Sequence, residues 1–243
     1  MLSTGYWLRR YNDNCVGGMS LYAFVQTAVS IAEKDMRVEF RRSYEVLSVL
    51  IFSLGAVMVC SYTFSGYAAP EVASAFLWII LFFAAILIFT TSFTRESDRG
   101  TLGGLKTIPC SSLAILLGKI IYGAFMLLVT EIVLSMFSVV FLGIDIIRMI
   151  SAMPILLIGA LALSSAGSFI SGLVMFSEGK TLLLSFLLFP VCLPVLMSGN
   201  VATSQILSGS SMSEVMPAVE MLIAFLMIIT FVMSSTFEFV IEE

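Results

Sequence analysis

Six long apolar stretches constrain what this chain can fold into more than any other feature of its sequence. They cover residues 47–64, 73–93, 120–142, 149–176, 181–197 and 221–237. Each is close to the roughly 20 residues that a helix needs to cross a bilayer. The sequence therefore predicts an all-α membrane protein with six transmembrane helices, in which both termini lie on the same side of the membrane.

Lysine and arginine residues divide unequally between the two sides that these spans define. Eleven of the 12 fall on the side of the termini, and Arg148 alone falls on the other side. Because cytoplasmic loops are enriched in lysine and arginine, we expect a multi-pass protein of the cell membrane, inner or plasma, with both termini and residues 94–112 in the cytoplasm. The connections 143–148 and 199–216 are expected outside, and the second is long enough for a small substructure or a re-entrant turn.

Composition excludes several other classes of protein. Hydrophobic residues make up 59% of the chain and charged residues only 12%, well below the ~25% charged content of soluble domains, so residues 21–243 are expected to form a single membrane domain. Acidic residues are spread over both sides, and nucleic acid is not an expected partner. The four cysteines show no close pairing and histidine is absent, so no disulfide framework, metal site or bound cofactor is predicted.

Two regions precede the first span. Residues 1–20 lack the apolar core of a signal peptide and are expected to be a disordered tail, with Met19 as an alternative start. Residues 21–45 are predicted to form an amphipathic helix that lies flat, either in the membrane interface or as a solvated helix beside it. Its apolar positions recur every three or four residues, at Leu21, Val25, Ala28, Ala32, Met36 and Phe40.

The longest charged connection, residues 94–112, joins the second and third spans. Ser97 or Asp98 is placed to cap a short helix that Pro109 would end. Leu102 and Leu105 are three residues apart and would share one side of that helix. The sequence therefore predicts a short amphipathic helix across the membrane face, and the alternative is a solvated loop.

Polar and small residues inside the spans are further candidates for function. Glu131 lies in the middle of the third span, where a charge costs at least ~2.5 kcal/mol. Two interpretations stay open: a protonated carboxyl bonded to a hydroxyl of another helix, or a group that carries a proton or gates a pathway. Pro190 and Pro194 predict a kink in the fifth span. Small residues at four-residue intervals predict a close-packing or sliding face on the fourth span, at Ala160, Ser164, Ser168 and Gly172.

Catalytic motifs are not recognisable in the sequence. Gly179, Lys180 and Thr181 resemble the end of a phosphate-binding loop, but Val174 occupies the position of the required earlier glycine and the flanking segments are predicted spans. We therefore expect this chain not to hydrolyse nucleotides and not to be an enzyme.

Several segments together resemble one family of membrane proteins. The first is residues 34–41, at the end of the amphipathic helix. The second is residues 93–102, with its pattern Arg95-Glu96-x-x-Arg99-Gly100-Thr101-Leu102, followed by Pro109 and by Leu117-Gly118-Lys119. The third is residues 189–196, followed by Ala202 and Thr203. From about residue 21 to its end the chain resembles the haem exporter protein B (CcmB) family, whereas residues 1–20 have no counterpart in it.

The resemblance implies a permease-like subunit of an ABC transporter complex for cytochrome c maturation. Its expected partners are a separate CcmA-like ATPase, a CcmC-like haem-handling subunit, a CcmE-like haem chaperone, the lipid bilayer and a second copy of the chain. The resemblance further implies haem as the ligand that the complex would transport or handle, with ATP hydrolysis driving release of the haem-loaded chaperone. The residues expected to dock the ATPase are Arg95, Glu96, Arg99, Leu102 and Leu105.

Two alternative functions stay open at this point. One is a general type-2 ABC exporter permease for a lipid, drug or glycan. The other is a membrane anchor that transports nothing and couples an ATPase to a partner complex.

Overall fold

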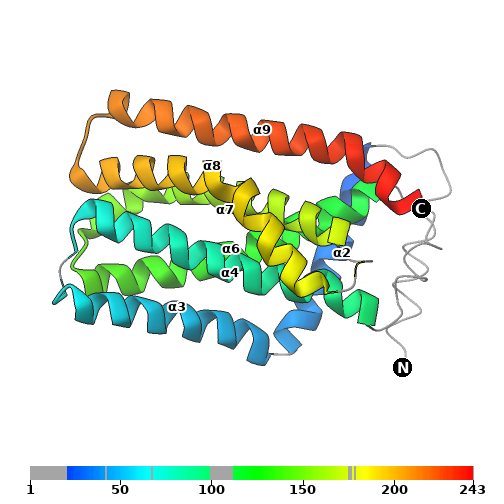
Figure 1. Cartoon of the computed structure of the whole chain (residues 1–243), viewed down its shortest axis with the longest axis horizontal. Helices are drawn as coiled ribbons and strands as arrows, with labels where there is room; N and C mark the ends of the chain where they lie inside the picture. The colour runs from blue at the N-terminus through cyan, green and yellow to red at the C-terminus, as the bar shows by residue number, and fades with distance from the viewer. Residues whose placement is uncertain are drawn as a thin grey trace.

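The computed structural model describes residues 21–41, 43–66, 68–98, 112–174, 177 and 179–242. In this part of the chain every regular element is a helix and no strand occurs (Figure 1). The helices are α2 (Leu21–Arg41), α3 (Ser43–Thr63), α4 (Pro70–Asp98), α6 (Ser112–Leu142), α7 (Ile146–Val174), α8 (Lys180–Ser208) and α9 (Met212–Glu242).

Six of the described helices are long and apolar enough to cross a membrane, which confirms the expected number of spans. Their apolar windows have mean hydropathies between 2.0 and 2.8. The windows are Val46–Thr63, Pro70–Thr90, Leu113–Leu142, Ile146–Val174, Thr181–Ser208 and Met212–Thr236. The remaining helix, α2, is not among them, as its mixed sequence of apolar and charged residues predicts.

The expected long connection at residues 199–216 is wrong. Helix α8 continues to Ser208 and α9 begins at Met212, so only residues 209–211 join them. Helix α8 is linked to α4 in this region: Trp78 of α4 donates a hydrogen bond to the hydroxyl of Thr203 over 3.0 Å, and Ser74 of α4 donates one to the backbone oxygen of Asn200 over 2.8 Å. Gly209 ends α8 in a left-handed conformation with φ 83°, which glycine adopts without strain.

The transmembrane helices run side by side, and their connections separate the bundle into two ends (Figure 1). The turns α3–α4, α6–α7 and α8–α9 lie at one end, which we call the turn end. Helix α2, the end of α4, the start of α6 and the C-terminus lie at the other, which we call the α2 end. Helix α4 is the most buried of the spans, and α9 and α3 are the most exposed. The core is therefore built around α4, with α6, α7 and α8 packed on it.

Two aromatic side chains of α4 fill spaces that glycines leave open in neighbouring helices. A Cβ atom added at Gly159 of α7 or Gly199 of α8 would overlap the indole of Trp78. A Cβ atom added at Gly167 of α7 would overlap the ring of Phe89 in the same way. Small residues thus let the helices approach closely around rigid rings, which drives association where lipid removes the hydrophobic effect between helices.

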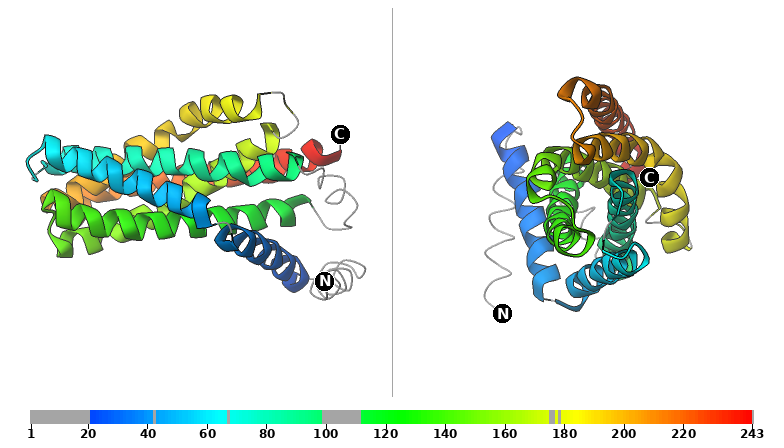
Figure 2. Two further views of the ribbon diagram at one scale, coloured as in Figure 1. Left: turned by 90° about the horizontal axis from the view of Figure 1, so that it is seen from below. Right: turned by 90° about the vertical axis from the view of Figure 1, so that its left-hand side faces the viewer.

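Helix α8 changes direction in its middle. Its first half, drawn in yellow, diverges from the bundle, and its second half packs within it (Figures 1 and 2). Pro190 and Pro194 lie inside the helix at this point, where each removes a backbone hydrogen bond. Leu182 and Phe186 in the diverging half are largely exposed, whereas Val195 and Ala202 in the second half are fully buried. The bend follows from the prolines, as expected.

Candidate functional site

The segment predicted to dock a soluble partner begins at the α2 end of the bundle. Helix α4 extends through Asp98, so Ser97 and Asp98 belong to its last turn and do not start a separate short helix. Arg95 and Glu96 lie in the same last turns of α4. Arg99, Leu102 and Leu105 lie outside the described residues, and the expected helix through them therefore stays a prediction. Because α6 begins at Ser112, residues 99–111 connect two core helices at this end.

Helix α2 crosses the outside of the bundle at the same end and packs mainly on the start of α6 (Figure 2). Ile31 and Ala28 lie directly over Gly118, where any added Cβ atom would meet them at 2.8–2.9 Å. Further along both helices, the rings of Phe40 and Phe125 meet edge to face with centroids 6.2 Å apart. Gly118 therefore sets how closely α2 approaches α6.

The burial pattern of α2 differs in part from the apolar face that its sequence predicts. Ala28 and Ala32 are buried against the bundle, and Met36 packs partly on the core. Val25 and Phe40, however, are about half exposed. The physical reason is that α2 packs on α6 along a narrow line, which leaves part of its apolar stripe outside. The predicted helix also ends at Arg41 instead of residue 45, and α3 begins at Ser43.

A buried ion pair joins α2 to α6 at this contact. The ammonium nitrogen of Lys119 lies 2.8 Å from Oδ2 of Asp35, and the side chains are only 3% and 12% exposed. Lys34, whose side chain is 52% exposed, lies 3.3 Å from the other carboxylate oxygen. The pair sits only two turns from Ser112, the residue at which α6 begins, so α2 is tied to the first turns of this span.

The electrostatics of this pair favour a charged Asp35. Burial opposes ionisation of its carboxyl group, but the ammonium groups of Lys119 and Lys34 together outweigh that effect and lower the pKa of Asp35 below its ordinary value. Glu39, one turn further along α2, is also buried. Removing one member of a buried ion pair is costly, because the remaining ion then has neither its partner nor water around it.

Glu131 lies inside the bundle as expected, with only 3% of the residue exposed. Within the described residues its Oε1 has no hydrogen-bond partner, so a bond from this atom to a hydroxyl of another helix is not formed. The hydroxyl of adjacent Thr130 donates to the backbone oxygen of Met126 in its own helix. The same span, Leu113–Leu142, also includes the ionisable residue Lys119.

The four small residues predicted on the fourth span all lie in the interior of α7: Ala160, Ser164, Ser168 and Gly172 are buried. The hydroxyl of Ser164 donates a hydrogen bond to the backbone oxygen of Ile120 in α6 over 2.7 Å. Ser171, on a neighbouring position, donates to the backbone oxygen of Phe89 over 3.0 Å. This face of α7 therefore brings backbones close and adds polar links between helices.

Groups that could hold a metal ion do not gather in the part of the chain that the structure describes. No cluster of three or more histidine, cysteine or acidic residues occurs there. Cys60 and Cys192 are buried as free thiols in different helices. Gly179 precedes α8 in a left-handed conformation with φ 71°, which glycine adopts without strain.

Sequence reasoning missed the contact between Asp35 and Lys119. Asp35 was one of several charges on the polar side of the expected amphipathic helix, and Lys119 directly preceded the expected third span. The available signal was Gly118, a small residue beside a cation at the start of a span, which suits a close helix contact. Periodicity within each helix could not reveal which two helices would meet.

Comparison with known proteins identifies the chain at the level of its family. A search among curated proteins gave no significant match. A scan against family models matched the CcmB protein family over residues 26–240, a range that extends from α2 to the last helix. The members of this family are permease-like membrane subunits, not catalytic ones, in the haem-export ABC complex of cytochrome c maturation, where they work with an ATPase. With nearly its whole length matched and six helices able to span a membrane, the chain belongs to the CcmB family.

Proposed function

We propose that the α2 end of this protein is the cytoplasmic end and that a CcmA-like ATPase docks there on residues 94–112. The family match supports an ATPase partner, and the distribution of lysine and arginine supports this orientation. The structure brings the end of α4, the start of α6 and α2 to one end of the bundle (Figure 1). Leu102 and Leu105 would enter an apolar groove of the ATPase, with Arg95, Glu96 and Arg99 at its rim.

The coupling runs through α6 in this proposal. The docked segment continues directly into α6, and the Asp35–Lys119 pair ties α6 to α2 two turns later. A movement of the ATPase would therefore reach α6 and α2 together. The expected partners beyond the ATPase are a CcmC-like haem-handling subunit and a CcmE-like haem chaperone. A second copy of this chain would complete a symmetric pair around two ATPase subunits.

The observation that carries the proposal is the family match over residues 26–240 together with the charged connection at the α2 end. A strain that lacks the gene and is complemented with wild-type or variant chain tests it. We expect c-type cytochromes to be lost without the gene and restored by the wild-type chain, as measured by haem staining. Normal cytochrome c maturation in the deletion strain would refute the proposed function.

One observation favours coupling over transport as the role of this subunit. In the described helices, the interior around Trp78 and Phe89 is filled by rings packed against glycines, and each buried ring closes the space between α4, α7 and neighbouring helices. A protein that only couples an ATPase to the release of the haem-loaded chaperone needs no pathway there. Haem uptake into inverted vesicles carrying the whole complex discriminates the two: ATP-dependent uptake would favour transport, and chaperone release without uptake would favour coupling.

A further inference from the structure

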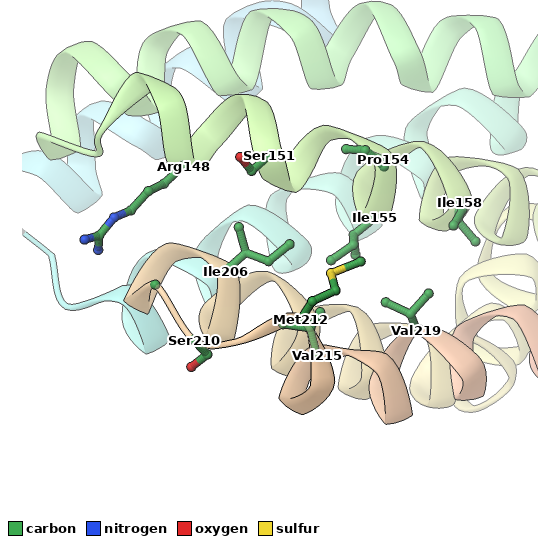
Figure 3. A pocket seen from close by; sticks show the side chains of 11 residues that line it. Arg148, Ser151, Pro154, Ile155, Ile158, Ile206, Ser210, Met212, Val215 and Val219 are labelled. Carbon is green, nitrogen blue, oxygen red and sulfur yellow. The ribbon is translucent and has the colours of Figure 1, made fainter.

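A groove lined mainly by apolar side chains runs along the surface at the turn end of the bundle, between α7, α8 and α9 (Figure 3). Its volume is about 410 Å³, within the roughly 300–1,000 Å³ typical of small-molecule sites. The apolar lining includes Pro154, Ile155 and Ile158 of α7, and Met212, Val215 and Val219 of α9.

The groove is elongated and follows the direction of the helices. Its lining on α7 extends from Arg148 to Ile158, a distance of about 15 Å at a rise of ~1.5 Å per residue. Figure 3 shows these side chains following one another along α7, with Met212, Val215 and Val219 on the facing helix. This shape suits an extended chain better than a compact ligand.

The polarity of the groove changes along its length. Arg148, Ser151 and Ser210 lie toward the turn end, and Ile158 and Val219 lie deeper along the bundle (Figure 3). Helix α7 begins at Ile146, so increasing residue number in α7 means increasing depth in the membrane. The groove thus runs from a polar entrance at the turn end to an apolar interior deeper along the bundle, the same order of polarity that one leaflet of a bilayer has from headgroups to acyl chains.

Arg148 gives the polar entrance a positive charge. One of its terminal nitrogens donates a hydrogen bond to the backbone oxygen of Leu207 over 2.6 Å, which fixes the side chain at the end of α8. Asp145 lies 4.0 Å from its Nε and is half exposed, and Glu214 in the first turn of α9 is exposed. An arginine has five N–H donors in a planar fork, so the bond to Leu207 and the distant Asp145 leave donors for another acceptor.

We propose that this groove binds a membrane lipid with an anionic phosphate headgroup, the phosphate on Arg148 and one acyl chain along α7 and α9. Arginine pairs with phosphate through two parallel hydrogen bonds, which gives geometric preference as well as charge. Ser151 and Ser210 lie at the same entrance as further polar groups. The proposal is independent of the orientation of the protein, because it requires only that the turn end lies at a membrane surface.

Native mass spectrometry of the full chain, purified in detergent, tests the proposal with phosphatidylglycerol and phosphatidylcholine as probes. We expect one phosphatidylglycerol molecule to remain bound, and about tenfold less phosphatidylcholine. Arg148→Gln, which keeps a polar side chain but removes the charge, should reduce bound phosphatidylglycerol about tenfold. Val219→Trp, at the deep end, should reduce both lipids by filling the space of the acyl chain. Arg37→Gln, at an exposed cation of α2, is the matched control and should change nothing.

Three results would overturn the proposal. Equal retention of both lipids by the wild-type chain would remove the role of the anionic headgroup. Unchanged phosphatidylglycerol binding in Val219→Trp would place the acyl chain elsewhere. Displacement of the lipid by millimolar inorganic phosphate would show that the site recognises a free anion and not a lipid. Because the first and third results come from the wild-type chain, the proposal stays testable even if a variant folds poorly.

Discussion

Removing one charge of the Asp35–Lys119 pair should loosen α2 from the bundle. The two side chains are 12% and 3% exposed, so each change leaves an ion in a poorly solvated place. Breaking a buried pair commonly costs about 3–5 kcal/mol. Asp35→Asn should fall in this range, because it removes the carboxylate that lies 2.8 Å from the ammonium nitrogen of Lys119. Lys119→Met should cost less, since Asp35 keeps Lys34 and some contact with water.

Hydrogen exchange of the α2 amides, measured by mass spectrometry on protein in nanodiscs, reports this local change. A cost of 3–5 kcal/mol corresponds to exchange faster by roughly two to three and a half powers of ten, at 1.36 kcal/mol per power. The double variant Asp35→Asn with Lys119→Met should recover most of the protection, because removing both members of a buried pair is often nearly neutral. Lys34→Met is the matched control: it removes a cation from the same carboxylate at an exposed position, and should cost at most about 1 kcal/mol.

The same pair predicts a pH dependence whose direction follows from the lowered pKa of Asp35. An aspartate with a folded-state pKa below its unfolded value of ~3.9 stabilises the fold above that value and loses the stabilisation as the pH falls through the folded-state pKa. Protection of α2 should therefore be full near neutral pH and decline only in strong acid, and the decline should be absent in the double variant. Equal effects of Lys34→Met and Asp35→Asn, or no recovery in the double variant, would refute a buried charge pair as the link between α2 and α6.

Three further predictions concern packing, the buried carboxyl group and topology. Gly159→Val should destabilise the fold by at least the roughly 1–3 kcal/mol typical of overpacking, because the valine side chain would overlap Trp78. Gly55→Val should cost little, because nothing lies within 4 Å of an added Cβ atom there. Thermal unfolding in detergent compares the two variants, and equal losses of stability would argue against the Trp78 contact. Glu131→Gln should insert into the membrane at the wild-type level. Glu131→Met should be no less stable than the wild-type chain, since burial of a polar atom without a partner costs about 1–3 kcal/mol. Membrane fractionation and thermal unfolding check this, and failure of both variants to insert would show that the carboxyl group has an essential partner. In sealed cells, a cysteine introduced at Ser210 should react with an impermeant thiol reagent and one at Ser97 should not, and the reverse pattern would invert the proposed orientation.

The sequence predicted the spans because apolar composition over about 20 residues is a local property of the chain. It placed their ends less well, as the connection between α8 and α9 shows. Asn200 and Thr203 were expected in the connection, yet Ser74 of α4 donates a hydrogen bond to the backbone oxygen of Asn200, and Trp78 of α4 donates one to the hydroxyl of Thr203. Such bonds depend on which helices are neighbours, which hydropathy alone does not encode.

The same distinction, between properties of one helix and contacts between helices, applies to the candidate sites. Burial of Glu131 and of the small residues on α7 could be predicted, because each depends on position within one apolar helix. The Asp35–Lys119 pair and the groove beside Arg148 depend on contacts between helices that are far apart in sequence. The partial exposure of Val25 and Phe40 on α2 also depends on where Gly118 lets the helix approach α6.

Recovery of the ATPase with the purified membrane subunit tests the central claim most directly. The wild-type chain should retain the CcmA-like ATPase, Leu102→Asp should abolish its recovery because a charge replaces an apolar anchor, and Arg99→Ala should reduce it modestly and more strongly at high salt. Each value is normalised to the amount of chain in the membrane. Undiminished recovery of the ATPase with Leu102→Asp would contradict docking at residues 94–112 and would point to α2 as the contact instead.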